Sequence, residues 1–135
     1  MLSRETEQRV RQHLRLAKGL LETAVLAESG SEFEERNALS RAYYAMFHAS
    51  SAWLLLRFGL EVKKLRHTEF HAEMHRRRGK EFGDFIRDIY GLRRAADYRE
   101  DWSPARMVTE DRLRKVRTNV LLLCDEVEVG LDETL

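Results

Sequence analysis

The chain has 135 residues, 43% of them apolar and 35% charged, so it can bury one core and is too apolar for an intrinsically disordered protein. Seven glycines and one proline are too few for an all-β sandwich or barrel, and a net charge of +1 excludes a generic polyanion binder. Cys124 is the only cysteine, so the chain has no intrachain disulfide, and its thiol is expected to be buried and inert. The sequence shows no signal peptide and no long apolar run, which predicts a soluble cytoplasmic protein.

Apolar residues recur at helical spacing in five successive segments. The first predicted helix covers about 4–28, and the second about 34–58, with Gly59 as its C-terminal cap. A short third helix over about 68–78 begins at Thr68 as N-cap, and a fourth covers about 81–98. The last helix is expected to begin near Thr109, a second N-cap candidate.

Each long segment places its apolar residues on one face. In the second helix this face consists mainly of alanine, which lets another helix approach closely. The pattern predicts an all-α fold, a single domain over 1–135 built as an antiparallel four-helix bundle with a short additional helix. The expected inner faces are Val10, Leu14, Ala17, Leu21 and Ala24; Ala42, Ala45, Ala49, Ala52 and Leu56; Phe85, Ile89, Leu92 and Ala96; and Leu113, Val116, Val120, Leu123 and Val127.

Three polar side chains in the second helix form the first candidate site. Arg41 and His48 are seven residues apart, about 20° short of two helical turns, and Tyr44 lies between them on nearly the same line. A guanidinium, a phenol and an imidazole in a row can hold a phosphate and move a proton. The same groups can instead form hydrogen bonds across the bundle that fix the register of its helices.

The end of the fourth helix carries the second candidate site. Arg93 and Asp97 are four residues apart, so they share a face and can form an ion pair, and Tyr98 follows at the helix exit. The alternative is a local salt bridge at a helix end, which contributes under ~1 kcal/mol when exposed.

The segment 63–80 holds seven Lys or Arg against two Glu, so almost all of the basic excess is concentrated there. It could follow a phosphate backbone, face an acidic protein partner or be a solvated helix face. His67, His71 and His75 form a stripe in this segment, but its H-x-E-x-H order differs from that of metalloproteases and no Cys is nearby, so no metal site is expected. His13, which lies among arginines, is expected on the surface.

The two polar motifs together resemble the HEPN domain family, and more narrowly its small stand-alone prokaryotic members. The specific parts are S-R-A-Y-Y-A-M-F-H-A at 40–49 and L-R-R-A-A-D-Y at 92–98, and the resemblance covers about 4–129. It implies a four-helix bundle with a short extra helix, a homodimer, and a minimal nucleotidyltransferase partner that acts as antitoxin to a HEPN toxin. Many HEPN toxins are metal-independent ribonucleases with a closely spaced Arg and His late in the bundle.

Arg93 matches the Arg of that motif, whereas 94–102 contains no His, and Asp97 and Tyr98 stand in its place. The resemblance therefore implies a toxin-like component that binds RNA or a nucleotide, with Arg93, His48 and Asp97 as candidate catalytic residues and no cofactor. Arg41, Tyr44 and Tyr98 are the candidate binding residues. The alternatives are a non-catalytic helical module that binds a nucleotidyltransferase through 63–80, and a metal-dependent hydrolase built on the His stripe.

Overall fold

The computed structural model describes residues 2–27, 32–98 and 106–134, and this part of the chain is helical throughout, without strands. The elements are the helices α1 (Arg4–Ala27) and α2 (Glu32–Phe58), the 3₁₀ turn η1 (Val62–Lys64), and the helices α3 (His67–Arg78), α4 (Lys80–Tyr98) and α5 (Arg106–Thr134). The predicted all-α bundle is confirmed, with α3 as the short additional helix.

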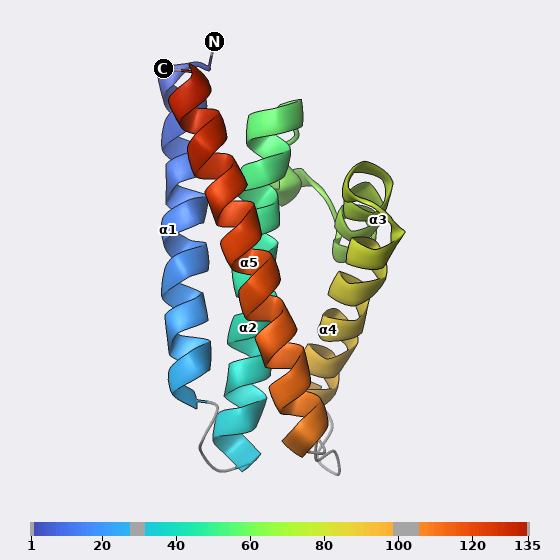
Figure 1. The fold of residues 1–135 in the computed structure, drawn as a ribbon. Coiled ribbons are helices and arrows are strands. Elements are labelled where there is room, and N and C mark those ends of the chain that lie inside the picture. Colours follow the sequence, from blue (N-terminus) through green and yellow to red (C-terminus); the bar gives the residue numbers. More distant parts are fainter. Residues whose placement is uncertain (1, 28–31, 99–105, 135) are drawn as a thin grey trace.

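Helix α2 is the central element, because it packs against α1, α4 and α5. Figure 1 shows α1 to the left of α2, α5 crossing obliquely in front of α2, and α4 to the right with the short α3 above it. Helix α1 begins and α5 ends at the same end of the bundle (Figure 1). No helix in the described part of the chain is long and apolar enough to cross a membrane.

The core is formed by the inner faces that the periodicity predicts for α1, α2 and α5. All five predicted residues of α1 and of α5 are buried, as are the four alanines of α2, while Leu56 is half-buried. Gly130 of α5 lies against Leu56, since a Cβ added there would be 2.7 Å from Leu56 Cδ2. The small residues of α2 thus admit two neighbouring helices, as the alanine pattern indicates.

In α4 the buried face differs from the predicted one. Phe85 and Leu92 are only half-buried. The buried positions of the helix instead include an arginine, Arg93, among apolar residues. The prediction is confirmed for Ile89 and Ala96, and it is wrong in leaving Arg93 out of the buried face. The buried face of α4 consists of Phe82, Gly83, Ile86, Ile89, Arg93 and Ala96.

The helix ends correct two expectations. Gly59 ends α2 with φ +65° and donates its N–H to the Leu55 carbonyl, as its predicted cap role requires. Helix α3 begins at His67, one residue before Thr68, and its N-cap Arg66 makes no side-chain capping bond. Helix α5 begins at Arg106, so Thr109 lies inside the helix and not at its start. The structure describes the backbone of Thr109 but not its side chain.

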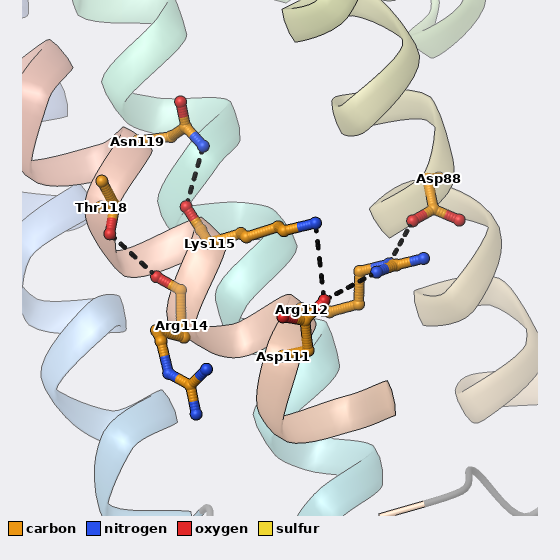
Figure 2. Close-up of polar contacts among 7 residues, drawn as sticks. All are labelled: Asp88, Asp111, Arg112, Arg114, Lys115, Thr118 and Asn119. Carbon is orange, nitrogen blue, oxygen red and sulfur yellow. Dashed lines mark hydrogen bonds and ion pairs between the residues drawn. The ribbon is translucent and has the colours of Figure 1, made fainter. Parts of the chain in front are cut away.

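Ion pairs on the surface join α5 to α4. Figure 2 shows Arg112 of α5 reaching Asp88 of α4, with its Nε 2.6 Å from Asp88 Oδ2. Asp111 holds the same guanidinium at 3.0 Å and Lys115 at 3.5 Å (Figure 2). These side chains are substantially exposed, so each pair contributes at most about 1 kcal/mol to stability.

Candidate functional site

Arg93 brings the two sequence motifs together. From the buried face of α4 its Nη1 lies 3.4 Å from the hydroxyl oxygen of Tyr44 on α2 and 3.1 Å from Asp97 Oδ2. The guanidinium carbon is also 5.4–5.6 Å from the ring centres of Tyr43, Tyr44 and Tyr90. Three electron-rich ring faces and one carboxylate therefore compensate a cation that has lost most of its water.

The remaining donors of Arg93 are unused. The residue is only 8% exposed, and its Nε is buried with no hydrogen-bond partner within the described ranges. Nη2 likewise makes no hydrogen bond to a described residue, yet it is not among the buried atoms. Nε and Nη2 form one edge of the guanidinium fork, the edge that binds a carboxylate or phosphate in bidentate fashion. The Nε–Nη2 edge, opposite Tyr44 and Asp97, is thus the part of Arg93 that could still bind an anionic group.

Tyr43 lies beneath Arg93 and links α2 to the His stripe of α3. Its buried hydroxyl is 2.7 Å from His67 Nδ1 and 3.0 Å from His71 Nε2, so it can donate to one imidazole and accept from the other. Burial raises the pKa of Tyr43 and lowers that of His71 to about 4. The pKa of His67 is also lowered, by burial and by the charge of Arg93. His67 and His71 therefore supply neutral hydrogen-bonding groups to Tyr43.

The end of α4 is fixed to α2 by a second arginine. Arg36 donates from Nη1 to the carbonyl of Ala96 at 2.8 Å, which satisfies one of the last carbonyls of α4. This contact holds the turn that carries Asp97 and Tyr98. Tyr98 is 71% exposed, so its ring is free to meet a ligand outside the bundle.

His48 belongs to a different group of side chains. Its Nδ1 lies 2.9 Å from Nδ1 of His13 on α1, and the two residues line a cavity between α1, α2 and η1. Burial lowers the pKa of both imidazoles, that of His48 to about 4 with a contribution from His13. The expectation of a surface His13 is wrong, because this half-buried side chain faces His48.

Arg41 is exposed and makes no hydrogen bond or ion pair with the parts of the chain that the structure describes. The structure therefore joins Tyr44, Arg93 and Asp97 and leaves Arg41 and Tyr98 on the outside. His48 is one helical turn from Tyr44, about 6 Å along α2. The sequence signal that could have found the His13 partner was its place three residues after Val10 and four before Ala17, at the edge of the apolar face of α1.

Internal ion pairs offset most of the basic segment 63–80. Glu73 binds both Arg76 and Arg77, and Arg78 is held by Glu126 of α5 at 2.6 Å. Arg66 pairs with Glu69 and Lys63 with Glu61. Lys64 and Lys80 make no ion pair within the described ranges.

Two further side-chain groups carry no visible chemistry. Cys124 is buried at the α5 core face, and burial raises the pKa of its thiol to about 11, so the thiol is protonated at neutral pH. Among the described residues, no three His, Cys, Asp or Glu side chains are placed to hold a metal ion. His71, which the H-x-E-x-H pattern would require as a ligand, points to Tyr43.

The chain was compared with protein families and with known proteins. No family model matches the chain. A UPF0332 protein from Pyrococcus horikoshii is 29% identical over 122 residues, which make up 88% of this chain and 79% of the relative. The similarity therefore extends over most of both proteins and includes both polar motifs in its span.

Proposed function

We propose that the chain is the toxin-like HEPN component of a pair with a minimal nucleotidyltransferase antitoxin, and that it binds RNA or a nucleotide at Arg93. The all-α bundle with a short extra helix and the similarity to UPF0332, a HEPN-like family, both support this assignment. A homodimer is part of the same proposal.

The observation that carries the proposal is the unused edge of Arg93. A buried N–H without a partner costs on the order of 1–3 kcal/mol, so a protein rarely leaves one without a reason. A phosphate could place one oxygen on Nη2 and a second on Nε once the side chains that cover Nε move aside, and both donors would then be satisfied. Tyr44 and Asp97 hold Nη1 in place, so the fork is already oriented before a ligand arrives.

The other candidate residues have distinct roles in this proposal. Tyr98 offers an exposed ring on which a base can stack, and Arg41 offers an uncompensated charge for a neighbouring phosphate. His48 has a lowered pKa and is therefore a neutral base at pH 7, which is the form that can accept a proton from a ribose hydroxyl. Asp97 acts on Arg93 and orients it.

The test measures binding of a fluorescent single-stranded RNA to wild type, Arg93→Ala and Arg93→Met by fluorescence anisotropy. Met fills much of the space of Arg without its charge, so this variant keeps the fold if Ala does not. Both changes should weaken binding by about tenfold or more, because a charge-assisted hydrogen bond is lost. The control is Arg94→Ala, which removes an exposed cation next to the site.

Equal affinities for wild type and Arg93→Met, or an equal loss in Arg94→Ala, would contradict the proposal. Each binding reaction is repeated with gel analysis of the RNA in the presence of a chelator. Cleavage that depends on His48 would extend the proposal to metal-independent ribonuclease activity.

One observation favours a second function, that of a non-catalytic module. A polar network at the interface of α2 and α4 could serve only to fix one helix on the other. It consists of Arg93, Asp97 and the three tyrosines. In this case Lys64 and Lys80 would help to dock an acidic surface of the nucleotidyltransferase. The same variants separate the two functions: a large fall in the thermal midpoint of Arg93→Ala, with unchanged RNA binding by Arg93→Met, supports the module.

A further inference from the structure

The cavity that His13 and His48 line is separate from Arg93, between α1, α2 and η1. It measures about 300 Å³, the lower end of the range for small-molecule sites. Four of the residues that line it are apolar, and the others are polar or charged, with His13 and His48 among them. The apolar lining residues are Leu16, Leu55, Leu60 and Val62.

The protons of the two histidines can be counted. Their Nδ1 atoms are 2.9 Å apart, so one of them carries a proton and donates it to the other. In the neutral pair, one Nε2 is then a donor and the other an acceptor. Neither Nε2 bonds to a described residue, and neither is fully buried, so both remain open to a ligand or to solvent.

Cations surround the mouth of the cavity. Lys63 lines it with 71% of its side chain exposed and lies 3.7 Å from Glu61, which also lines the cavity and pairs with Arg9. Gln12 also belongs to a groove of about 410 Å³ along α1 that contains Arg11 and Arg15. The surroundings thus combine an apolar interior, imidazole rings and a basic rim.

This combination distinguishes between ligand classes. A bare inorganic anion would need an uncompensated cation inside, but the inner cation Arg9 is paired with Glu61. A flat ring with a polar edge suits the interior, since bases stack on histidine and hydrogen-bond to it when they leave the helical stack. Phosphates attached to that ring would meet the basic rim.

We infer that the cavity holds one unstacked base of a single-stranded RNA, with the neighbouring phosphates on Lys63 and the α1 arginines. The inference rests on the proposed RNA-binding function for its ligand class, but not on Arg93. His48 and Tyr44 are one turn apart on α2, so a strand that contacts Arg93 through its phosphate passes close to the cavity.

The experiment compares two single-stranded oligoribonucleotides of equal length, oligouridylate and the corresponding abasic strand, by fluorescence anisotropy. Wild type should bind the strand that carries bases more tightly by about tenfold, the size of one stacked base. His13→Leu and His48→Leu should lose this preference, because Leu keeps the volume and removes both nitrogens. Thr23→Leu changes an exposed position of α1 and is the control, which should keep the preference for the strand with bases.

Salt dependence separates the two sites. Arg93→Ala removes a phosphate contact, so it should weaken both strands alike and reduce the slope of log affinity against log salt. The leucine variants should leave that slope unchanged. Equal binding of both strands by wild type, or a preference that survives His48→Leu, overturns the base pocket and leaves the Arg93 proposal intact; no binding of either strand overturns both.

A second measurement needs no variant. The imidazole nitrogens of wild type are followed by nuclear magnetic resonance while uridine monophosphate or inorganic phosphate is added. Shifts at Nε2 of His13 and His48 with the nucleotide alone support the inference. Equal shifts with inorganic phosphate, or none with the nucleotide, overturn it.

Discussion

Arg93 and its neighbours show how one residue can serve both packing and binding. Its Nη1 and its ring contacts stabilise the interface of α2 and α4, while Nη2 and the buried Nε have no hydrogen-bond partner among the described residues. Asp97 balances the charge from a partly exposed position. A buried ion pair of this kind is weak evidence for stability by itself, because desolvation offsets its Coulombic gain. The unpaired edge is the stronger indication of function.

Four histidines should make stability depend on pH: His13 and His48, which contact each other, and His67 and His71, which contact Tyr43. The pKa values of His48 and His71 are about 4 in the folded protein, against the ordinary 6.5 expected for the unfolded chain. Between these values the unfolded state binds more protons, so acid favours unfolding. The free energy of unfolding should therefore be highest above pH 6.5 and fall on acidification toward pH 4.

Urea unfolding at pH 7, 6 and 5 measures this effect. Each buried histidine contributes a slope of up to about 1.4 kcal/mol per pH unit within that window. His71→Gln should make the slope shallower, since it removes one titrating group and keeps a polar side chain beside Tyr43. A free energy of unfolding that stays constant from pH 7 to 5 would show that the imidazoles titrate normally.

At the scale of helices, the sequence predicts α1, α2 and α5 well, because their apolar stripes are regular and their cores contain no charge. It fails at the inner face of α4, where Arg93 occupies a core position that periodicity assigns to Leu92. It also fails at Thr68 and Thr109, since a capping residue type does not by itself place a helix start. The sequence grouped Tyr44 and Arg93 in one site, and the two side chains do lie together. The contact of His48 with His13 could be found only from the packing of α1 on α2.

Two glycines of α4 provide a matched test of helix packing. A Cβ at Gly83 would lie 2.5 Å from His75 Cβ and 2.7 Å from its Cα, so α3 would have to move. A Cβ at Gly91 would meet nothing within 4 Å. Gly83→Ala should lower the free energy of unfolding by about 1–3 kcal/mol through overpacking, and Gly91→Ala should raise it by up to about 1 kcal/mol through helix propensity.

Urea denaturation of both variants, with circular dichroism as the signal, measures these changes. Opposite signs are the expected result. A Gly83→Ala variant as stable as Gly91→Ala would mean that α3 does not approach α4 as closely as the structure has it.

At the scale of the whole molecule, the centre of the bundle is α2. It packs against three long helices, and its residues Tyr43, Tyr44 and His48 supply both candidate sites. Helix α3, by contrast, packs mainly against α4. It contacts α2 through hydrogen bonds to Tyr43 and through ring contacts that include Phe70 with Phe47. The two parts of the molecule should therefore differ in local stability, since local opening follows the number of buried contacts that must be broken.

Amide hydrogen exchange followed by mass spectrometry tests this difference. Peptides from the middle of α2 should exchange only through global unfolding, while peptides from α3 exchange faster through local opening. Tyr43→Phe removes the hydroxyl that joins α3 to α2, so it should speed exchange in α3 more than in α1. Tyr90→Phe is the control, because the Tyr90 hydroxyl makes no hydrogen bond to the described residues. Equal exchange rates in α2 and α3 of wild type would show that α3 opens only when the whole bundle unfolds. The predicted difference in local stability would then be wrong.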